Sequence, residues 1–320
     1  MATLPTVLMT DTIRATQPGQ SHGGAFLVDL ERGTHRQVID WNEQNIAWDG
    51  RGAERGMRGT AIRGREIFIA VHNRILVFDP EFRLLREHTS PHLGDCHELC
   101  LDGETLYAAS TRFDSILALD LASGEFTRAW MFRVPWEKDP RTNPGQPQPR
   151  PVIVTYDPRS GKGPPAADTV HLNHAWSEDG RLYFSGVLLK HVLYFEGGGL
   201  RKHADVPDWT HNARPFRGGV LCNSTGADAI CHLDTRGTII KQFPVVKYDP
   251  AALLNVPPEK NAARQGFARG LVATPDGLII GGSSPGTVSA YDYESGSPVR
   301  SVNVSMDVRR APHGLAVWPW

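Results

Sequence analysis

The stretch GAFLVDLERGTHRQVI, residues 24–39, has two short apolar runs on either side of an acidic turn that ends in glycine. The same order of an apolar residue, an acid, a few polar residues and usually glycine recurs in FDPEF (78–82), LDLASG (119–124), FEGGG (195–199), LDTRG (233–237) and YDYESG (291–296). Each copy lies between two strand-like runs, so each predicts a β-hairpin whose turn uses Asp or Gly to reach unusual backbone angles.

A second turn precedes each later hairpin, in IRGREIFIA, LDGETLYAA, EDGRLYFSG, FRGGVLCNS and PDGLIIGGS. With both turns, each unit becomes a four-stranded antiparallel sheet of about 40 residues, the size of one β-propeller blade. The first unit lacks its innermost strand, and HGLAVWPW (313–320) supplies a strand that has no blade of its own. We therefore predict an all-β, six-bladed β-propeller over residues 1–320, closed by the C-terminal strand joining the N-terminal strands, which protects the strand edges.

Composition argues against several partners. The 320 residues carry a formal charge of −1, which gives no basic footprint for nucleic acid or an acidic membrane. No apolar run is long enough to span a bilayer, and the N-terminus lacks the pattern of a signal peptide, so we expect a cytoplasmic protein. The four cysteines, Cys96, Cys100, Cys222 and Cys231, match no zinc or redox spacing. The oligomeric state stays open.

Three connections are too long for simple turns between blades: 40–56, 134–168 and 245–265. The middle one is rich in proline and is incompatible with a regular helix. All three precede the innermost strand of a blade, so we expect them to gather on one face of the disc. Long ordered loops of this kind are often functional.

When the innermost strands are aligned by the turns that end them, one position carries a charged or imidazole side chain in every blade. Its members are Arg58, His97, His174, His211, Arg269 and His313. Innermost strands line the central channel of a propeller, so these six side chains should converge near its axis. A single histidine there would more often be hydrogen-bonded to water, but four equivalent ones favour a metal site. Neutral imidazoles favour Zn, Fe, Cu or Ni over Ca or Mg.

His97, His211 and His313 lie on alternate blades, which would leave a metal with an open position for substrate. His174 is either a fourth ligand or an acid/base above the metal, and His171 competes for either role. Arg58 and Arg269 would clamp a substrate carboxylate. The alternative for both arginines is an ion pair with an acid such as Glu98 or Glu54.

The segments PHGLAV (312–317) and ARGLVATPDG (268–277) resemble the NHL and SMP-30-like six-bladed propellers. The placement of His97, His211 and His313, with Arg58 at the rim, resembles the peptidyl-hydroxyglycine amidating lyase. That resemblance implies a zinc ion held by three histidines that cleaves a carbinolamide. His174 stands where that family has a tyrosine. The four-histidine set is also similar to that of the carotenoid oxygenases, which hold ferrous iron.

Three functions follow as hypotheses. The first is a metal-dependent lyase or hydrolase, with Zn or Fe at the axis and a small anionic substrate oriented by Arg58 and Arg269. The second is a non-heme Fe or Cu oxygenase or oxidase that uses His97, His174, His211 and His313. The third is a non-catalytic propeller that serves as a binding scaffold.

Overall fold

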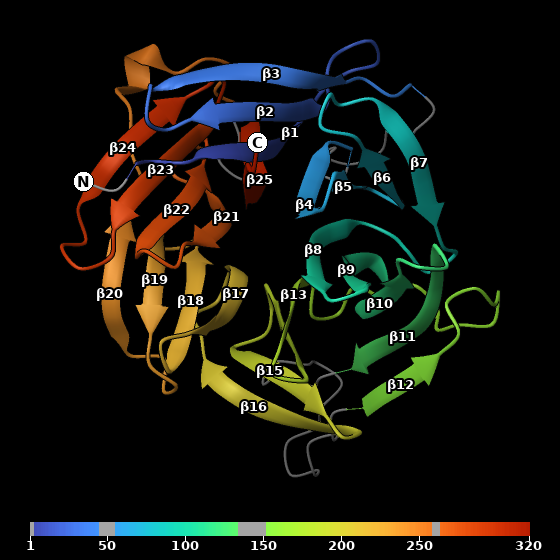
Figure 1. Cartoon of the computed structure of the whole chain (residues 1–320). Helices are drawn as coiled ribbons and strands as arrows, with labels where there is room; N and C mark the ends of the chain where they lie inside the picture. The colour runs from blue at the N-terminus through green and yellow to red at the C-terminus, as the bar shows by residue number, and fades with distance from the viewer. Residues whose placement is uncertain (1–2, 45–54, 134–151, 258–262) are drawn as a thin grey trace.

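The structure is a computed structural model that describes residues 3–44, 55–133, 152–257 and 263–320. In these residues six antiparallel sheets follow one another around a central axis (Figure 1). Helix is confined there to two short 3₁₀ turns, η1 (Thr111–Phe113) and η2 (Pro250–Ala252). No described helix is long and apolar enough to cross a lipid bilayer. The predicted all-β, six-bladed propeller is confirmed.

The blades are numbered here in chain order, and each is given from its innermost to its outermost strand. Blade 1 contains β25 (Arg310–Val317), β1 (Thr6–Ile13), β2 (Gly23–Asp29) and β3 (Thr34–Trp41). Blade 2 contains β4 (Met57–Arg63), β5 (Glu66–Val71), β6 (Arg74–Phe78) and β7 (Leu84–Thr89). Blade 3 contains β8 (Cys96–Asp102), β9 (Thr105–Ser110), β10 (Ser115–Asp120), β11 (Glu125–Arg133) and β12 (Val152–Tyr156).

Blade 4 contains β13 (Leu172–Glu178), β14 (Arg181–Gly186), β15 (His191–Glu196) and β16 (Gly199–Asp205). Blade 5 contains β17 (Thr210–Phe216), β18 (Gly219–Ser224), β19 (Ala229–Leu233) and β20 (Ile239–Pro244). Blade 6 contains β21 (Ala268–Ala273), β22 (Leu278–Ser283), β23 (Thr287–Asp292) and β24 (Pro298–Asn303).

Blade 1 closes the ring as predicted. β25 pairs antiparallel with β1, with Val7 opposite Val317 and Leu8 opposite Ala316. The first and last strands of the chain therefore share one sheet. This pairing satisfies the backbone groups of both strands and removes the open edge that an unclosed ring would expose.

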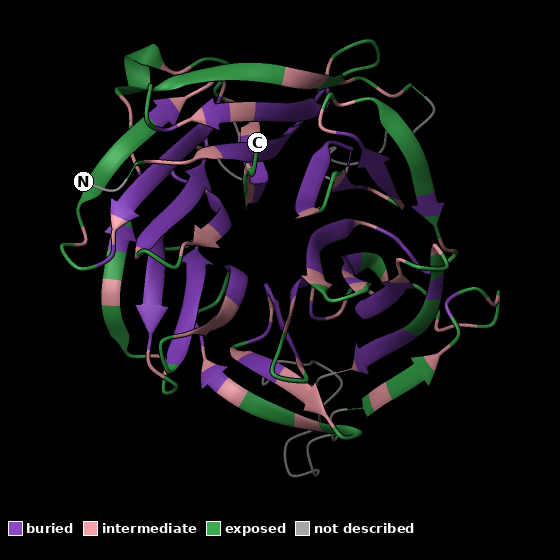
Figure 2. Ribbon diagram, viewed as in Figure 1, coloured by how far each residue is buried: buried purple, intermediate pink, exposed green. Residues whose placement is uncertain are grey.

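The hydrophobic core is divided into layers between neighbouring blades. One layer, for example, joins Phe68 and Ile75 of blade 2 to Leu106 and Leu117 of blade 3, all fully buried. Figure 2 shows the inner strands buried and long stretches of the outer strands exposed. Burying each such side chain stabilises the fold by about 1.5–3 kcal/mol, so the stacking of blades around the axis holds the inner strands in place.

Blade 3 differs from the prediction because it has a fifth strand. β12 pairs with β11, with Trp130 opposite Thr155. The sequence VIVTY has the β-branched composition of an edge strand, but it lies inside the proline-rich connection 134–168 that we expected to be loop. Parts of the three long connections, residues 45–54, 134–151 and 258–262, lie outside the described residues, and so does Glu54.

Candidate active site

Every innermost strand begins with the same irregularity. In all six blades the pairing of the innermost strand with its neighbour shifts by one residue near its start. Such a bulge sets two successive residues against one on the partner strand and re-aims their side chains. It defines two rings of equivalent positions around the axis.

The pairing that precedes each bulge fixes which residues are equivalent. Cys96 pairs with Ser110, Leu172 with Gly186, and Thr210 with Ser224, each at the last residue of the second strand. The next residue in each blade forms the first ring: Arg58, His97, Asn173, His211, Arg269 and His313. The residue after that forms the second ring: Gly59, Glu98, His174, Asn212, Gly270 and Gly314.

The placement of His174 in the first ring was therefore wrong by one residue. Asn173 holds that position and donates through its Nδ2 to the carbonyl of Thr210, 2.9 Å away. The error arose because the strands were aligned by the glycines of their terminal turns, and Gly180 lies seven residues after Asn173 whereas Gly103 lies six residues after His97. His174 lies instead beside Glu98, with 3.9 Å between its Nδ1 and Glu98 Oε2.

The other three histidines do share the first ring, on alternate blades. His97, His211 and His313 are each at most 7% exposed. The rings of His97 and His313 have their centroids 6.2 Å apart. Burial lowers the pKa of all three well below the usual histidine value, and the nearby guanidinium of Arg269 lowers each pKa further. All three imidazoles are therefore neutral near pH 7, the form that binds metals.

The three imidazoles also share a backbone contact. In each case the Nδ1 atom lies within hydrogen-bonding distance of the carbonyl oxygen two residues earlier in the chain. The pairs are His97 with Asp95 at 2.9 Å, His211 with Trp209 at 3.1 Å and His313 with Ala311 at 3.0 Å. A carbonyl only accepts, so Nδ1 carries the hydrogen and Nε2 keeps its lone pair. The Nε2 of His211 is buried and has no hydrogen-bond partner among the described residues.

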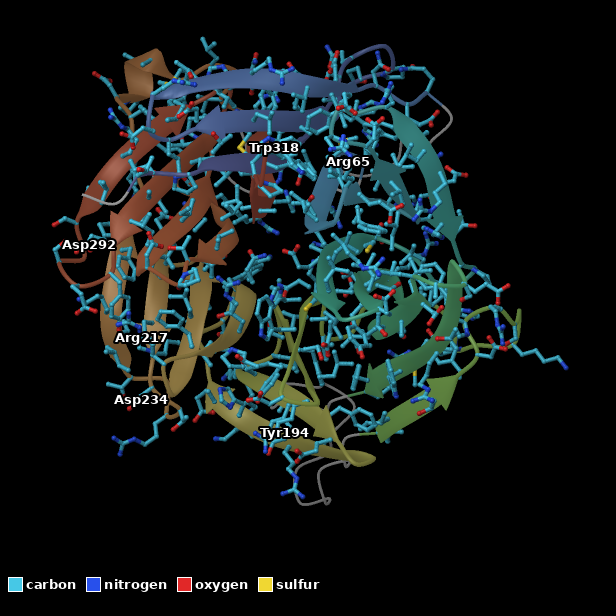
Figure 3. All side chains as sticks on the ribbon, in the orientation of Figure 1. Arg65, Tyr194, Arg217, Asp234, Asp292 and Trp318 are labelled. Atoms are coloured by element: carbon cyan, nitrogen blue, oxygen red, sulfur yellow. The ribbon has the colours of Figure 1, made fainter. Side chains whose placement is uncertain are left out.

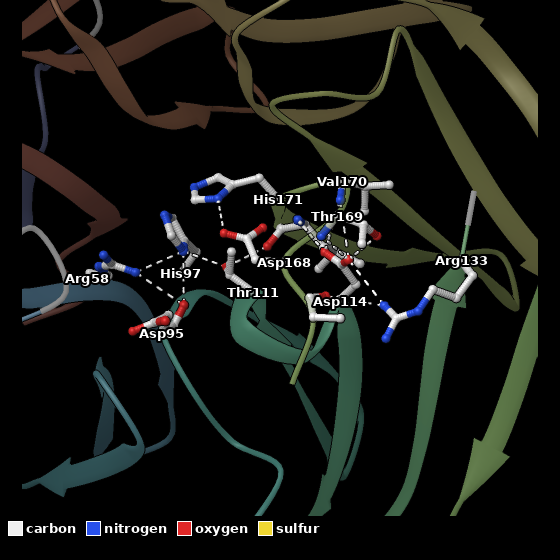
Figure 4. A network of polar contacts seen from close by, with 12 residues as sticks. Arg58, Asp95, His97, Thr111, Asp114, Arg133, Asp168, Thr169, Val170 and His171 are labelled. Carbon is white, nitrogen blue, oxygen red and sulfur yellow. Dashed lines mark hydrogen bonds and ion pairs between the residues drawn. The ribbon is translucent and has the colours of Figure 1, made fainter. Parts of the chain in front are cut away.

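Thr111 supports this assignment for His97. Its hydroxyl oxygen lies 2.6 Å from His97 Nδ1 and 2.6 Å from the carbonyl oxygen of Leu172 (Figure 4). The hydroxyl donates its hydrogen to that carbonyl, so its oxygen accepts from the Nδ1–H of His97. Arg58 Nη1 donates to the carbonyl of Asp95 at 3.1 Å and lies 2.8 Å from His97 Nδ1; with the hydrogen on Nδ1, this second approach is a contact between two donors and not a hydrogen bond.

The two arginines take the predicted positions in the first ring. Arg58 and Arg269 are 3% and 9% exposed. The guanidinium of Arg269 lies 5.3 Å from the centre of the Phe267 ring. Both arginines act on the pKa of His313, so two positive charges lie near that imidazole. An anion in the first ring would be stabilised by this field.

The second ring is polar on one side and closely packed on the other. Asn212 donates a short hydrogen bond to Glu98, and we call this contact the crossbar because it joins blades 3 and 5 across blade 4. Burial raises the pKa of Glu98 to about 8. On the opposite side, a Cβ atom at Gly59 would lie 2.4 Å from Glu98 Cα, and one at Gly314 would lie 2.5 Å from the Arg58 carbonyl oxygen. Only glycine fits these two positions.

His171 lies just before β13 and reaches the first ring from the side. Its ring centroid is 5.2 Å from that of His97, and its Nδ1 lies 2.8 Å from Asp168 Oδ2. Its side chain is 35% exposed, and its backbone is left-handed, with φ of 51°. A non-glycine residue in this conformation costs about 1–3 kcal/mol, which the surrounding structure must offset.

Asp114 offsets this cost by fastening the segment that carries His171 (Figure 4). Its fully buried carboxylate accepts from Thr169 N and Thr169 Oγ1, both at 2.6 Å, and from Val170 N at 3.2 Å. Arg133 adds an ion pair at 3.3 Å. Sequence reasoning missed Asp114, Thr111 and Asn212, because their partners lie on distant segments and no local motif marks them.

Within the described part of the chain, no three His, Cys, Asp or Glu side chains are grouped closely enough to hold one metal ion. The metal site at His97, His211 and His313 therefore stays a prediction, as do the catalytic roles of Arg58, Arg269, His171 and His174.

No protein-family model and no curated protein matches the chain. It is similar in fold to a chain of a nidogen/laminin complex, with a TM-score of 0.57 and 10% identity over 97% of both chains. A virginiamycin B lyase from Staphylococcus aureus aligns with a TM-score of 0.45 and 13% identity over 78% of this chain and 71% of that one. The WD40 β-propeller domain of Doa1 aligns with a TM-score of 0.45 and 13% identity, over 77% of this chain and 68% of that one. At such identities the likeness concerns the propeller fold.

Proposed function

We propose that the protein is a metal-dependent enzyme in which His97, His211 and His313 hold a divalent transition metal, Zn or Fe, near the propeller axis. The observation that carries this proposal is the shared hydrogen bond from Nδ1 of each ring to a backbone carbonyl. Metal-binding histidines are held in this way, because the bond fixes the tautomer and orients the Nε2 lone pair. Three copies on alternate blades give a set of neutral imidazole nitrogen donors, which suits these metals.

Such a metal, when bound, would polarise a substrate oxygen or generate hydroxide from water. Arg58 and Arg269 orient the carboxylate of a small anionic substrate, since guanidinium groups bind carboxylates through paired N–H donors. His171, oriented by Asp168, holds or moves a proton at its Nε2. These roles suit lyase- or hydrolase-type chemistry. His174 lies in the second ring and has no first-ring role in this proposal.

Elemental analysis of the purified protein tests the metal directly. We expect about one Zn or Fe per chain in the wild type and loss of metal in His97→Ala, His211→Ala and His313→Ala. His35→Ala is the matched control, because His35 is an exposed histidine on the outer strand β3 and its loss should leave the metal content unchanged. Metal content that is the same in all five proteins would reject the proposal.

Kinetics then separates the substrate clamp from the metal. Among carboxylate-bearing compounds turned over by the wild type, Arg58→Lys and Arg269→Lys should raise KM while retaining metal. Iron or copper, with oxygen consumed during turnover, would replace the lyase or hydrolase proposal with the oxygenase alternative.

A further inference from the structure

A second group of polar side chains lies on the innermost strands of blades 4 and 5, at the second ring and further along these strands, away from the first ring. It contains His174 and Trp176 of β13 and Arg214 of β17. Four of their nitrogen atoms are buried and have no hydrogen-bond partner among the described residues: His174 Nδ1, His174 Nε2, Trp176 Nε1 and Arg214 Nη2. His174 as a whole is 5% exposed. Each buried polar group left without a partner costs about 1–3 kcal/mol, so such groups normally have a bound partner.

The three side chains contact one another. The rings of His174 and Trp176 are near-parallel, at 16°, with centroids 6.4 Å apart. The guanidinium carbon of Arg214 lies 4.9 Å from the centre of the Trp176 ring. The positive charge of Arg214 also acts on the pKa of His174. One small ligand can therefore reach donors from both strands.

The charges in this group favour a negative ligand. Burial lowers the pKa of Arg214 to about 10, so it remains a cation at neutral pH. His174 is neutral, because burial lowers its pKa to about 3. Glu98, the buried acid nearby, accepts a hydrogen bond from Asn212, and its contacts among the described residues include no ion pair with Arg214. Glu178, the other acid that acts on Arg214, is exposed at the end of β13, where solvent screens its charge.

The hydrogen-bonding groups of these side chains also favour a negative ligand, because most of them donate. Arg214 Nη2 and Trp176 Nε1 only donate, and neutral His174 adds one more N–H. The Nη2 group of Arg214 is buried without a hydrogen-bond partner among the described residues, and a bound anion would offset the cost of this unpaired donor.

We propose that Arg214, Trp176 and His174 bind a small monovalent anion, a halide or a short carboxylate, past the crossbar. This site is separate from the three first-ring imidazoles and does not depend on a metal. The bound anion links the inner strands of blades 4 and 5 through side chains that otherwise lack partners.

Bromide tests the proposal, because it scatters X-rays anomalously and its position can be read from a difference map. In wild-type crystals soaked in bromide, we expect a peak within hydrogen-bonding distance of Arg214 and Trp176. Arg214→Met removes the charge while keeping a similar stem, and it should abolish the peak. Arg217→Met is the matched control: Arg217 lies in the turn after β17, is exposed and pairs with Glu294 (Figure 3), so the peak should remain.

Trp176→Phe provides a milder variant if Arg214→Met does not fold. It keeps the aromatic ring but loses one N–H donor, so the occupancy of bromide should fall. A wild-type map that shows only ordered water at this position would overturn the proposal. An unchanged peak in Arg214→Met, or in Trp176→Phe where that is the variant that folds, would overturn it as well. Metal analysis of the same crystals keeps this result apart from the fate of the first-ring metal.

Discussion

Replacing Asp114 by alanine should destabilise the propeller strongly. The carboxylate is fully buried and accepts three hydrogen bonds from Thr169 and Val170, in addition to its ion pair with Arg133. A hydrogen bond to a charged group contributes about 1.5–3 kcal/mol, but bonds to one carboxylate are not additive. Breaking a buried ion pair by removing one partner costs about 3–5 kcal/mol. We therefore expect Asp114→Ala to lower the free energy of unfolding by about 3–5 kcal/mol.

Equilibrium urea denaturation, followed by tryptophan fluorescence, measures this change. Asp120→Ala is the control, because Asp120 also accepts bonds from one nearby residue, Ser123 N and Oγ at 2.7 Å, but in an exposed turn. The free energy of unfolding should decrease much less in Asp120→Ala than in Asp114→Ala. Asp114→Asn keeps one acceptor oxygen, so its free energy of unfolding should lie between those of the wild type and the alanine variant. A loss below about 1 kcal/mol for Asp114→Ala would refute the view that this carboxylate fastens the segment before β13.

Three further predictions concern the rings and blade 1. Thr111→Val removes the oxygen that accepts from His97 Nδ1, so metal affinity, measured by competition with a chelator, should fall by about 10-fold or more. Gly59→Ala should prevent correct folding, as judged by yield and circular dichroism, because its Cβ would lie 2.4 Å from the next blade. Gly161→Ala, which meets nothing within 4 Å, should be tolerated. Burial raises the pKa of Asp11 from 3.8 to about 6, so the folded state binds this proton more tightly than the unfolded state does. The contribution of Asp11 to the free energy of unfolding is therefore complete below about pH 4. It decreases by roughly 3 kcal/mol as the pH rises through about 6. In Asp11→Asn, the free energy of unfolding measured by denaturation between pH 4 and pH 7 should lack this decrease. The same pH dependence in the variant and the wild type would contradict the raised pKa of Asp11.

The propeller could be predicted from the sequence because its signals are local. The turns after Val28, Leu119 and Tyr291 repeat an acid and a glycine, and the apolar runs around them have strand length. The closing strand followed from counting, since one blade lacked a strand and the last segment lacked a blade. β12 was missed because neighbouring prolines dominate its local signal.

Only part of the candidate site could be predicted from the sequence. Five of the six first-ring residues were identified because the ring follows the repeat. Asn173 was not, because the turn glycine that guided the alignment lies at different distances from the ring residue in different blades, and only pairing between strands fixes the register. The roles of Thr111 and Asp114 depend on contacts with residues 61 and 55 positions away. Such contacts exist only in the folded chain, so sequence patterns do not reveal them.

The central claim is that three imidazoles from alternate blades share one metal ion, and anomalous diffraction at the absorption edge of the metal tests it most directly. The account predicts one peak near the axis, about 2.0–2.2 Å from the Nε2 atoms of His97, His211 and His313. A peak at any other set of side chains, or three imidazoles with no peak among them in a protein that contains metal, would contradict it.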